Sequence, residues 1–144
     1  MIRPLLLCFA LLLATPAFAQ GPLKAFLTGL GQGELVAGDG PSYRAIVNGA
    51  EVLRLDVAGD GRATLTTSDK TGKTDSRFFT NRQLDALDAA LGQAGGPSEA
   101  PTIAAGCKPE TGIIIETIVE GRYKYAVECG GGPLAKAVEI LRGR

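Results

Sequence analysis

The sequence contains no histidine and no tryptophan, and only three cysteines occur among its 144 residues. Serine and cysteine nucleophiles usually require an imidazole base, and histidine is also the commonest metal ligand in proteins. Ser-His-Asp and Cys-His catalytic sites and histidine-based zinc sites are therefore excluded. We accordingly predict no catalytic residues, no metal site and no cofactor.

A concentrated block of charge is also missing. The 15 basic and 15 acidic side chains balance, so the formal net charge is zero. Nucleic-acid-binding domains normally carry a basic stripe or patch, and no such stripe is visible here. We therefore predict that the protein has no nucleic-acid partner.

Long apolar runs are absent except at the N-terminus. There Arg3 precedes an apolar run over residues 5–13, and Ala-Phe-Ala follows at 17–19. This order is typical of a secretory signal peptide, and the run is shorter than the roughly 20 apolar residues that an anchor helix needs. We interpret residues 1–19 as a signal peptide, which predicts a secreted or periplasmic protein without a transmembrane anchor after cleavage.

Cleavage there would leave two cysteines, Cys107 and Cys129. An even number of cysteines in an exported chain indicates a disulfide. We predict that these two residues are bonded and that the disulfide is buried. Two free thiols are the alternative, and the spacing does not resemble the Cys-x-x-Cys of redox enzymes.

The centre of the chain, residues 42–79, consists of short alternating runs separated by glycine turns. These turns are Asn48-Gly49, Asp60-Gly61 and Thr71-Gly72. Asn-Gly and Asp-Gly between alternating runs are strong signals of β-hairpins. The region therefore predicts an antiparallel meander.

The register of this meander can be chosen from its apolar pattern. A three-residue loop at 59–61 sets Leu55 opposite Leu65, whereas a two-residue loop would set Leu55 opposite Thr66. We favour the longer loop because it gives one apolar and one polar face, as in a sheet that is covered on one side.

A helix is predicted at residues 80–91, after the meander. Thr80 and Gln83 have the spacing of a capping box, and leucines recur at helical spacing behind them. Gly92 is the expected C-terminal cap. We expect this helix to cover the apolar face of the meander.

A second hairpin is predicted around Glu120-Gly121. With a three-residue loop at 119–121, Ile115 would face Tyr125 and Glu116 would face Lys124. Both pairings are favourable across strands. Three glycines and Pro133 then precede a short C-terminal helix, since proline suits the first turn.

The predicted fold class is α+β: an antiparallel sheet of five to six strands, formed by the meander and the C-terminal hairpin, with one face covered by one or two helices. The predicted organisation is a signal peptide at 1–19, a glycine-rich flexible leader at 20–41 and a single domain at 42–144.

The sequence points to a non-catalytic binding or interaction module of the bacterial cell envelope. We expect the polar sheet face to be free, with Arg44, Arg54 and Lys124 as candidate contacts for an envelope protein or a small ligand. The flexible loop at residues 92–106 is the alternative binding surface. The alternatives are a small carboxylate-dependent hydrolase and an inhibitor of an exported enzyme.

Export and oxidation can be checked together. Mass spectrometry of protein isolated from its native compartment should show Gln20, or its cyclised form, as the first residue. Both remaining thiols should be blocked because they form one disulfide. Recovery of free thiols, or of an intact 1–19 segment, would contradict the prediction.

Overall fold

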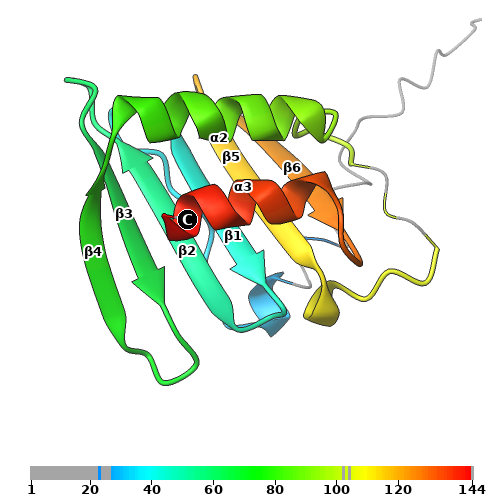
Figure 1. Ribbon diagram of the computed structural model, residues 1–144. Coiled ribbons are helices and arrows are strands. Elements are labelled where there is room, and N and C mark those ends of the chain that lie inside the picture. Colours follow the sequence, from blue (N-terminus) through cyan, green and yellow to red (C-terminus); the bar gives the residue numbers. More distant parts are fainter. Residues whose placement is uncertain (1–22, 24–26, 102, 104, 144) are drawn as a thin grey trace, which may run out of the picture.

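The computed structural model describes residues 23, 27–101, 103 and 105–143 (Figure 1). It contains a six-stranded antiparallel sheet in the order β4-β3-β2-β1-β5-β6, and the fold is α+β as predicted. The predicted signal peptide, residues 1–19, lies outside the described residues. The elements are β1 (Ser42–Val47), β2 (Glu51–Val57), β3 (Ala63–Ser68), β4 (Thr74–Phe79), α2 (Asn81–Gln93), a 3-10 helix (Pro109–Thr111), β5 (Ile113–Val119), β6 (Arg122–Glu128) and α3 (Pro133–Arg142).

The predicted register of the meander is confirmed. Leu55 faces Leu65 between β2 and β3, and the Ala58 N–H donates to the Arg62 carbonyl at 2.8 Å to close the loop between them. Gly61 ends this loop with a φ of +86°. Glycine adopts this left-handed conformation without steric cost, which explains why the loop ends in glycine.

Helix α2 begins as predicted but ends later. Thr80 is its N-cap, and the capping box with Gln83 is present. Gly92 was expected to end the helix, which instead continues to Gln93. The left-handed glycine is Gly95, with a φ of +87°. A capping glycine must take that conformation, and Gly92 stays within the helix one position beyond the buried Leu91.

The predicted register of the second hairpin is wrong by one residue. The turn between β5 and β6 has two residues, Glu120 and Gly121, both with positive φ, as in a type I′ turn. Glu116 therefore faces Tyr125, and Lys124 faces Thr117. The apolar pattern could not distinguish the two registers, because β5 is buried on both faces. The observed turn also requires a positive φ at Glu120, which is uncommon for a non-glycine residue.

Helices α2 and α3 cover one face of the sheet, which we call the helix face (Figure 1). Leu55, Leu65, Leu87, Ile115 and Val138 belong to the apolar core between the helices and the sheet, and each is at most 1% exposed. Removing a leucine of this kind typically costs about 2–5 kcal/mol of stability.

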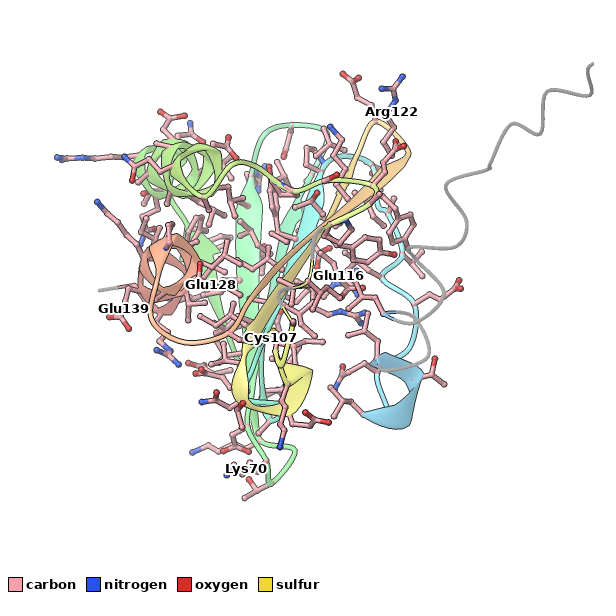
Figure 2. All side chains as sticks on the ribbon, turned by 90° about the vertical axis from the view of Figure 1, so that its right-hand side faces the viewer. Lys70, Cys107, Glu116, Arg122, Glu128 and Glu139 are labelled. Atoms are coloured by element: carbon pink, nitrogen blue, oxygen red, sulfur yellow. A yellow bond between two sulfur atoms is a disulfide. The ribbon has the colours of Figure 1, made fainter. Side chains whose placement is uncertain are left out.

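The first turn of helix α3 is capped by the carboxylate of a residue outside the helix, and not by its own N-cap residue. Its N-cap residue, Gly132, has no side chain to accept a hydrogen bond. Glu128, at the end of β6, instead accepts the Leu134 N–H through Oε2 at 3.0 Å. Figure 2 shows Glu128 on the side of the sheet that faces the helices. Negative charge at this position is favourable because the N-terminus of a helix carries partial positive charge.

The opposite face, which we call the second face, carries a second apolar cluster. Its buried members are Leu23, Leu27, Ile46, Ile114 and Tyr125. The short helical segment that contains Leu27 lies on this side, so the sheet is the middle of three layers (Figure 2). The expectation that the polar face is free is wrong over β1, β5 and β6, because leucines of the leader cover it.

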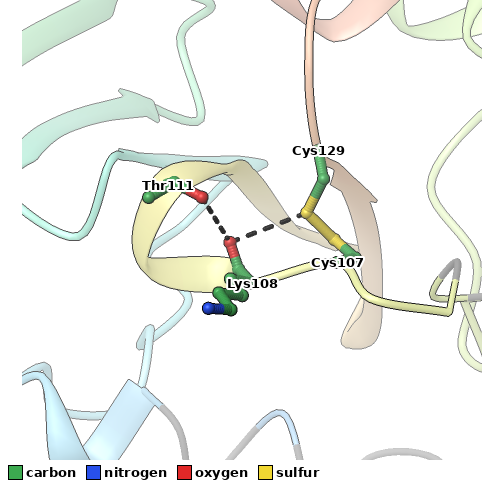
Figure 3. The surroundings of a disulfide bond; sticks show 4 residues. All are labelled: Cys107, Lys108, Thr111 and Cys129. Carbon is green, nitrogen blue, oxygen red and sulfur yellow. Dashed lines mark hydrogen bonds between the residues drawn. A yellow bond between two sulfur atoms is a disulfide. The ribbon is translucent and has the colours of Figure 1, made fainter.

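The predicted disulfide between Cys107 and Cys129 is present, with Cα atoms 5.4 Å apart. Cys129 is exposed and Cys107 half-buried, so the expectation of a buried disulfide is wrong: Cys129 follows the last residue of β6 and lies outside both cores. The Lys108 carbonyl accepts a hydrogen bond from the Thr111 hydroxyl at 3.2 Å (Figure 3). The disulfide therefore attaches the 3-10 helix region to the end of β6.

The tyrosine beneath α2 provides a test of the packing of this helix on the sheet. The Tyr43 hydroxyl donates to Asp88 at 3.3 Å. Burial, reinforced by the negative charge of Asp88 and this hydrogen bond, raises the pKa of Tyr43 to about 12. The folded-state pKa thus exceeds the usual value of about 10. The contribution of the neutral Tyr43 side chain to the free energy of unfolding is therefore fully present below pH ~10 and is lost as pH rises towards 12.

We therefore expect Tyr43 to give a tyrosinate absorbance transition near pH 12, measured in a chain without tryptophan. Tyr43→Phe should remove that late transition and reduce the alkaline loss of stability. Asp88→Asn should shift the transition only partly, because burial is the larger cause. An unchanged titration in Tyr43→Phe would refute the assignment.

Candidate functional site

The three candidate residues lie in two different places. Arg44 on β1 and Arg54 on β2 face each other across the strand pair and share the second face. Lys124 lies on the other side, because the corrected β6 register pairs it with Thr117. It lines a shallow depression beside Tyr43 and α2. The structure therefore brings the two arginines together and separates Lys124 from them.

A small cavity of about 210 Å³ is present on the second face, between the sheet and the leader segment. Strands β1, β5 and β6 form its floor, and residues 27–35 form its roof. Its lining residues are Leu27, Thr28, Gln32, Gly33, Glu34, Leu35, Arg44, Glu116, Tyr123 and Tyr125. We call this space the second-face cavity.

The cavity wall contains a buried ion pair. Arg44 and Glu116 face each other across β1 and β5, and they are 5% and 2% exposed. The Arg44 Nε donates to Glu116 Oε2, and Nη1 donates to the Gly33 carbonyl at 2.8 Å. Figure 2 shows Glu116 on the side of the sheet that faces the leader segment.

These hydrogen bonds do not involve the third nitrogen of the Arg44 guanidinium. Arg44 Nη2 is buried and makes no hydrogen bond with any residue in the described part of the chain. A buried donor without a partner typically costs about 1–3 kcal/mol, and more when the group is charged. Such atoms are rare in folded proteins and each requires an explanation. An acceptor supplied by a small bound molecule would satisfy Nη2.

Two tyrosines form the aromatic side of the cavity. The rings of Tyr123 and Tyr125 are stacked, with centroids 6.2 Å apart and an interplanar angle of 24°. Burial, together with the negative charges of Glu116 and Glu34, raises the pKa of Tyr125. Its hydroxyl is therefore neutral at physiological pH and can donate or accept a hydrogen bond.

The backbone of Tyr125 is fixed from outside the sheet. Its N–H donates to the Ser98 carbonyl, and the Ser98 N–H donates to the Tyr125 carbonyl, both at 2.8 Å. This bridge extends the sheet beyond β6. The loop after α2 therefore holds the strand that forms the aromatic wall.

Arg54 has a structural role beside the cavity. It donates to both carboxylate oxygens of Asp56 and to the Val36 carbonyl at 3.1 Å. Burial raises the pKa of Asp56, but the hydrogen bonds from Arg54 and Ser42 outweigh this and hold it below its usual value. Arg54 thus fixes the leader at Val36, while Arg44 fixes it at Gly33.

The two arginines therefore bind the leader on either side of a buried leucine. Leu35 lies between these two carbonyl contacts and is fully buried. The apolar side chain and the two flanking hydrogen bonds act on the same short segment. The roof of the cavity is consequently attached to the sheet by both polar and apolar contacts.

The site offers few other kinds of chemistry. No group of three or more histidine, cysteine, aspartate or glutamate side chains that could hold a metal ion occurs among residues 23, 27–101, 103 and 105–143. Of the two carboxylates at the cavity, Glu116 is buried and paired, whereas Glu34 is exposed. Within that same described part, no helix has both the length and the apolar character to cross a bilayer.

Sequence reasoning missed Glu116, Tyr123 and Tyr125 as site residues. The shifted hairpin register had placed both tyrosines on the other face, and Glu116 opposite Lys124. An available signal was the two-residue Glu120-Gly121 turn, which sets the observed register when both residues take positive φ.

The protein-family models, curated proteins and solved structures with which the chain was compared contain no match to it.

The buried Arg44–Glu116 ion pair leads us to a prediction about the free energy of unfolding. Arg44→Met alone, or Glu116→Leu alone, should lower the free energy of unfolding by about 3–5 kcal/mol, because each leaves an uncompensated buried charge. The double variant should recover most of this loss, since two apolar side chains of similar volume replace the pair. Urea denaturation of the four proteins measures this difference. Additive losses in the double variant would show that the pair is not coupled in this way.

Proposed function

We propose that the chain is an exported, non-catalytic protein that binds a small molecule in the second-face cavity. The observation that carries the proposal is the buried Nη2 of Arg44, which has no hydrogen-bond partner among the described residues of the cavity wall. The signal-peptide pattern of residues 1–19 and the Cys107–Cys129 disulfide support export to an oxidising compartment.

The size of the cavity limits the ligand. Pockets for drug-sized molecules typically occupy about 300–1,000 Å³, whereas this cavity holds about 210 Å³. A single-ring molecule is the appropriate size, because benzene binds in an engineered cavity of about 150 Å³.

The lining residues define the chemistry of the ligand. Arg44 requires an acceptor, and the carboxylates of Glu116 and Glu34 favour donors over additional negative charge. The stacked rings of Tyr123 and Tyr125 favour a planar molecule. The combination favours an uncharged planar ligand with a carbonyl or amide group at one edge.

The cavity gives no support to a carboxylate-dependent hydrolase. Glycosidase-type chemistry needs two carboxyl groups that flank the scissile bond, and the acid of the pair has a raised pKa. Here Glu116 is engaged by Arg44, and Glu34 is exposed at the rim. No observation at this site favours an enzyme inhibitor either.

Benzamide tests the proposal because it combines one ring with a carbonyl acceptor and amide donors. Titration of the full-length protein followed by amide NMR should give saturable shifts at Gly33 and Tyr125. Benzoate should bind at least roughly tenfold more weakly because of Glu116 and Glu34. Toluene should also bind at least roughly tenfold more weakly, because it cannot satisfy Arg44 Nη2.

The folded double variant Arg44→Met with Glu116→Leu should lose benzamide binding. Arg62→Gln is the matched control, because Arg62 forms an exposed ion pair with Asp60 and is not among the residues that line the cavity; this variant should bind benzamide as well as the wild type. The proposal fails if benzamide causes no saturable shift. It also fails if the double variant binds with unchanged affinity.

A further inference from the structure

The two edge strands of the sheet differ in whether another segment of the chain hydrogen-bonds to their outer side. At one edge, Ser98 hydrogen-bonds to the outer side of β6 through Tyr125. At the other, β4 pairs with β3 alone, and five of its six residues are exposed. Proteins usually block such edges with proline, inward-facing charge, a bulge or a covering segment. Strand β4 has no proline and no covering segment among the described residues, but it carries two charged side chains of opposite sign, Asp75 and Arg77.

The outward-facing backbone groups of β4 can be identified. In an antiparallel pair, residues alternate between those that hydrogen-bond across the pair and those that point away. The Asp69 N–H donates to the Lys73 carbonyl at 3.1 Å, and the hydrogen-bonded positions of β4 therefore continue at Asp75 and Arg77. Thr74, Ser76 and Phe78 direct their N–H and C=O groups away from β3.

This alternation limits how two copies of β4 could pair around a two-fold axis. An antiparallel pair must match outward-facing residues with one another. Centring the axis on Asp75 would set Asp75 opposite itself, and centring it on Arg77 would set Arg77 opposite itself. Centring it on Ser76 sets Asp75 of each copy opposite Arg77 of the other.

The register centred on Ser76 gives the outward-facing backbone groups hydrogen-bond partners and also sets opposite charges across from each other. Ser76 pairs with Ser76 of the second copy, and Thr74 pairs with Phe78, so all of the outward-facing groups of the three residues gain partners. Asp75 and Arg77 occupy the non-hydrogen-bonded positions, where opposed side chains come closest. Both are exposed, and Arg77 donates to the Leu141 carbonyl through Nη2, so its guanidinium lies on the helix face.

We propose that β4 is a self-association surface, at which two copies of this chain pair antiparallel around Ser76 and join their sheets. The contact also shields Phe78, whose side chain is 79% exposed in the single chain. Phe78 would lie opposite Thr74 of the second copy on the second face. The partner is thus specified by the charge pattern of the strand itself.

The inference is tested by sedimentation velocity of the full-length protein over micromolar to millimolar concentrations. The wild type should show a reversible monomer–dimer equilibrium. Asp75→Arg and Arg77→Asp should each weaken dimerisation by roughly tenfold or more, because each turns two attractive cross-strand pairs into repulsive ones. An equimolar mixture of the two variants should recover dimerisation, since the strand with arginine at both positions then opposes the strand with aspartate at both.

Glu110→Arg is the matched control. Glu110 is an exposed acidic residue in the 3-10 helix before β5, outside β4, so dimerisation should not change. Circular dichroism verifies that each variant is folded. A wild type that stays monomeric throughout the concentration range overturns the proposal. The register is also overturned if Asp75→Arg leaves dimerisation unchanged, or if mixing the two variants does not restore dimerisation.

Discussion

The pairing of β1 with β5 is the contact on which the rest of the structure depends. It joins the meander to the C-terminal hairpin and places Arg44 opposite Glu116. Every residue of β1 is buried, because the strand lies in the middle of the sheet with a layer on each face. The polar side chains of this strand must therefore find partners within the protein, and Arg44 finds them in Glu116 and Gly33.

Burial on both faces explains why a cavity forms at this point. The leader contributes Leu27 and Leu35 to the roof of the second-face cavity, while Arg44 is part of its floor. A guanidinium cannot be packed as closely by leucine side chains as another leucine could, because its nitrogen atoms require hydrogen-bond partners. The space lined by Arg44, Glu116 and the two tyrosines is consistent with this conflict between apolar packing and buried charge.

The features that could be predicted from the sequence depend on residues close together in the chain. The capping box of Thr80 and the loop that ends at Gly61 each involve a few neighbouring residues, and both are confirmed. The β5–β6 register could not be chosen by apolar pattern, since isoleucines occupy both faces of β5. The Arg44–Glu116 pair depends on a contact between strands that are distant in sequence, and no local signal specifies it.

The connection from α2 to β5 links the oxidised state of the protein to the cavity. It is attached to β6 at two points, through the Ser98 backbone at Tyr125 and through Cys107 at Cys129. On the chain-entropy model, a disulfide across such a loop contributes about 3 kcal/mol. Because Tyr125 is part of the cavity wall, the contacts that restrain this connection also restrain the aromatic side of the site. A disulfide at the surface can therefore support the wall of this cavity without lining it.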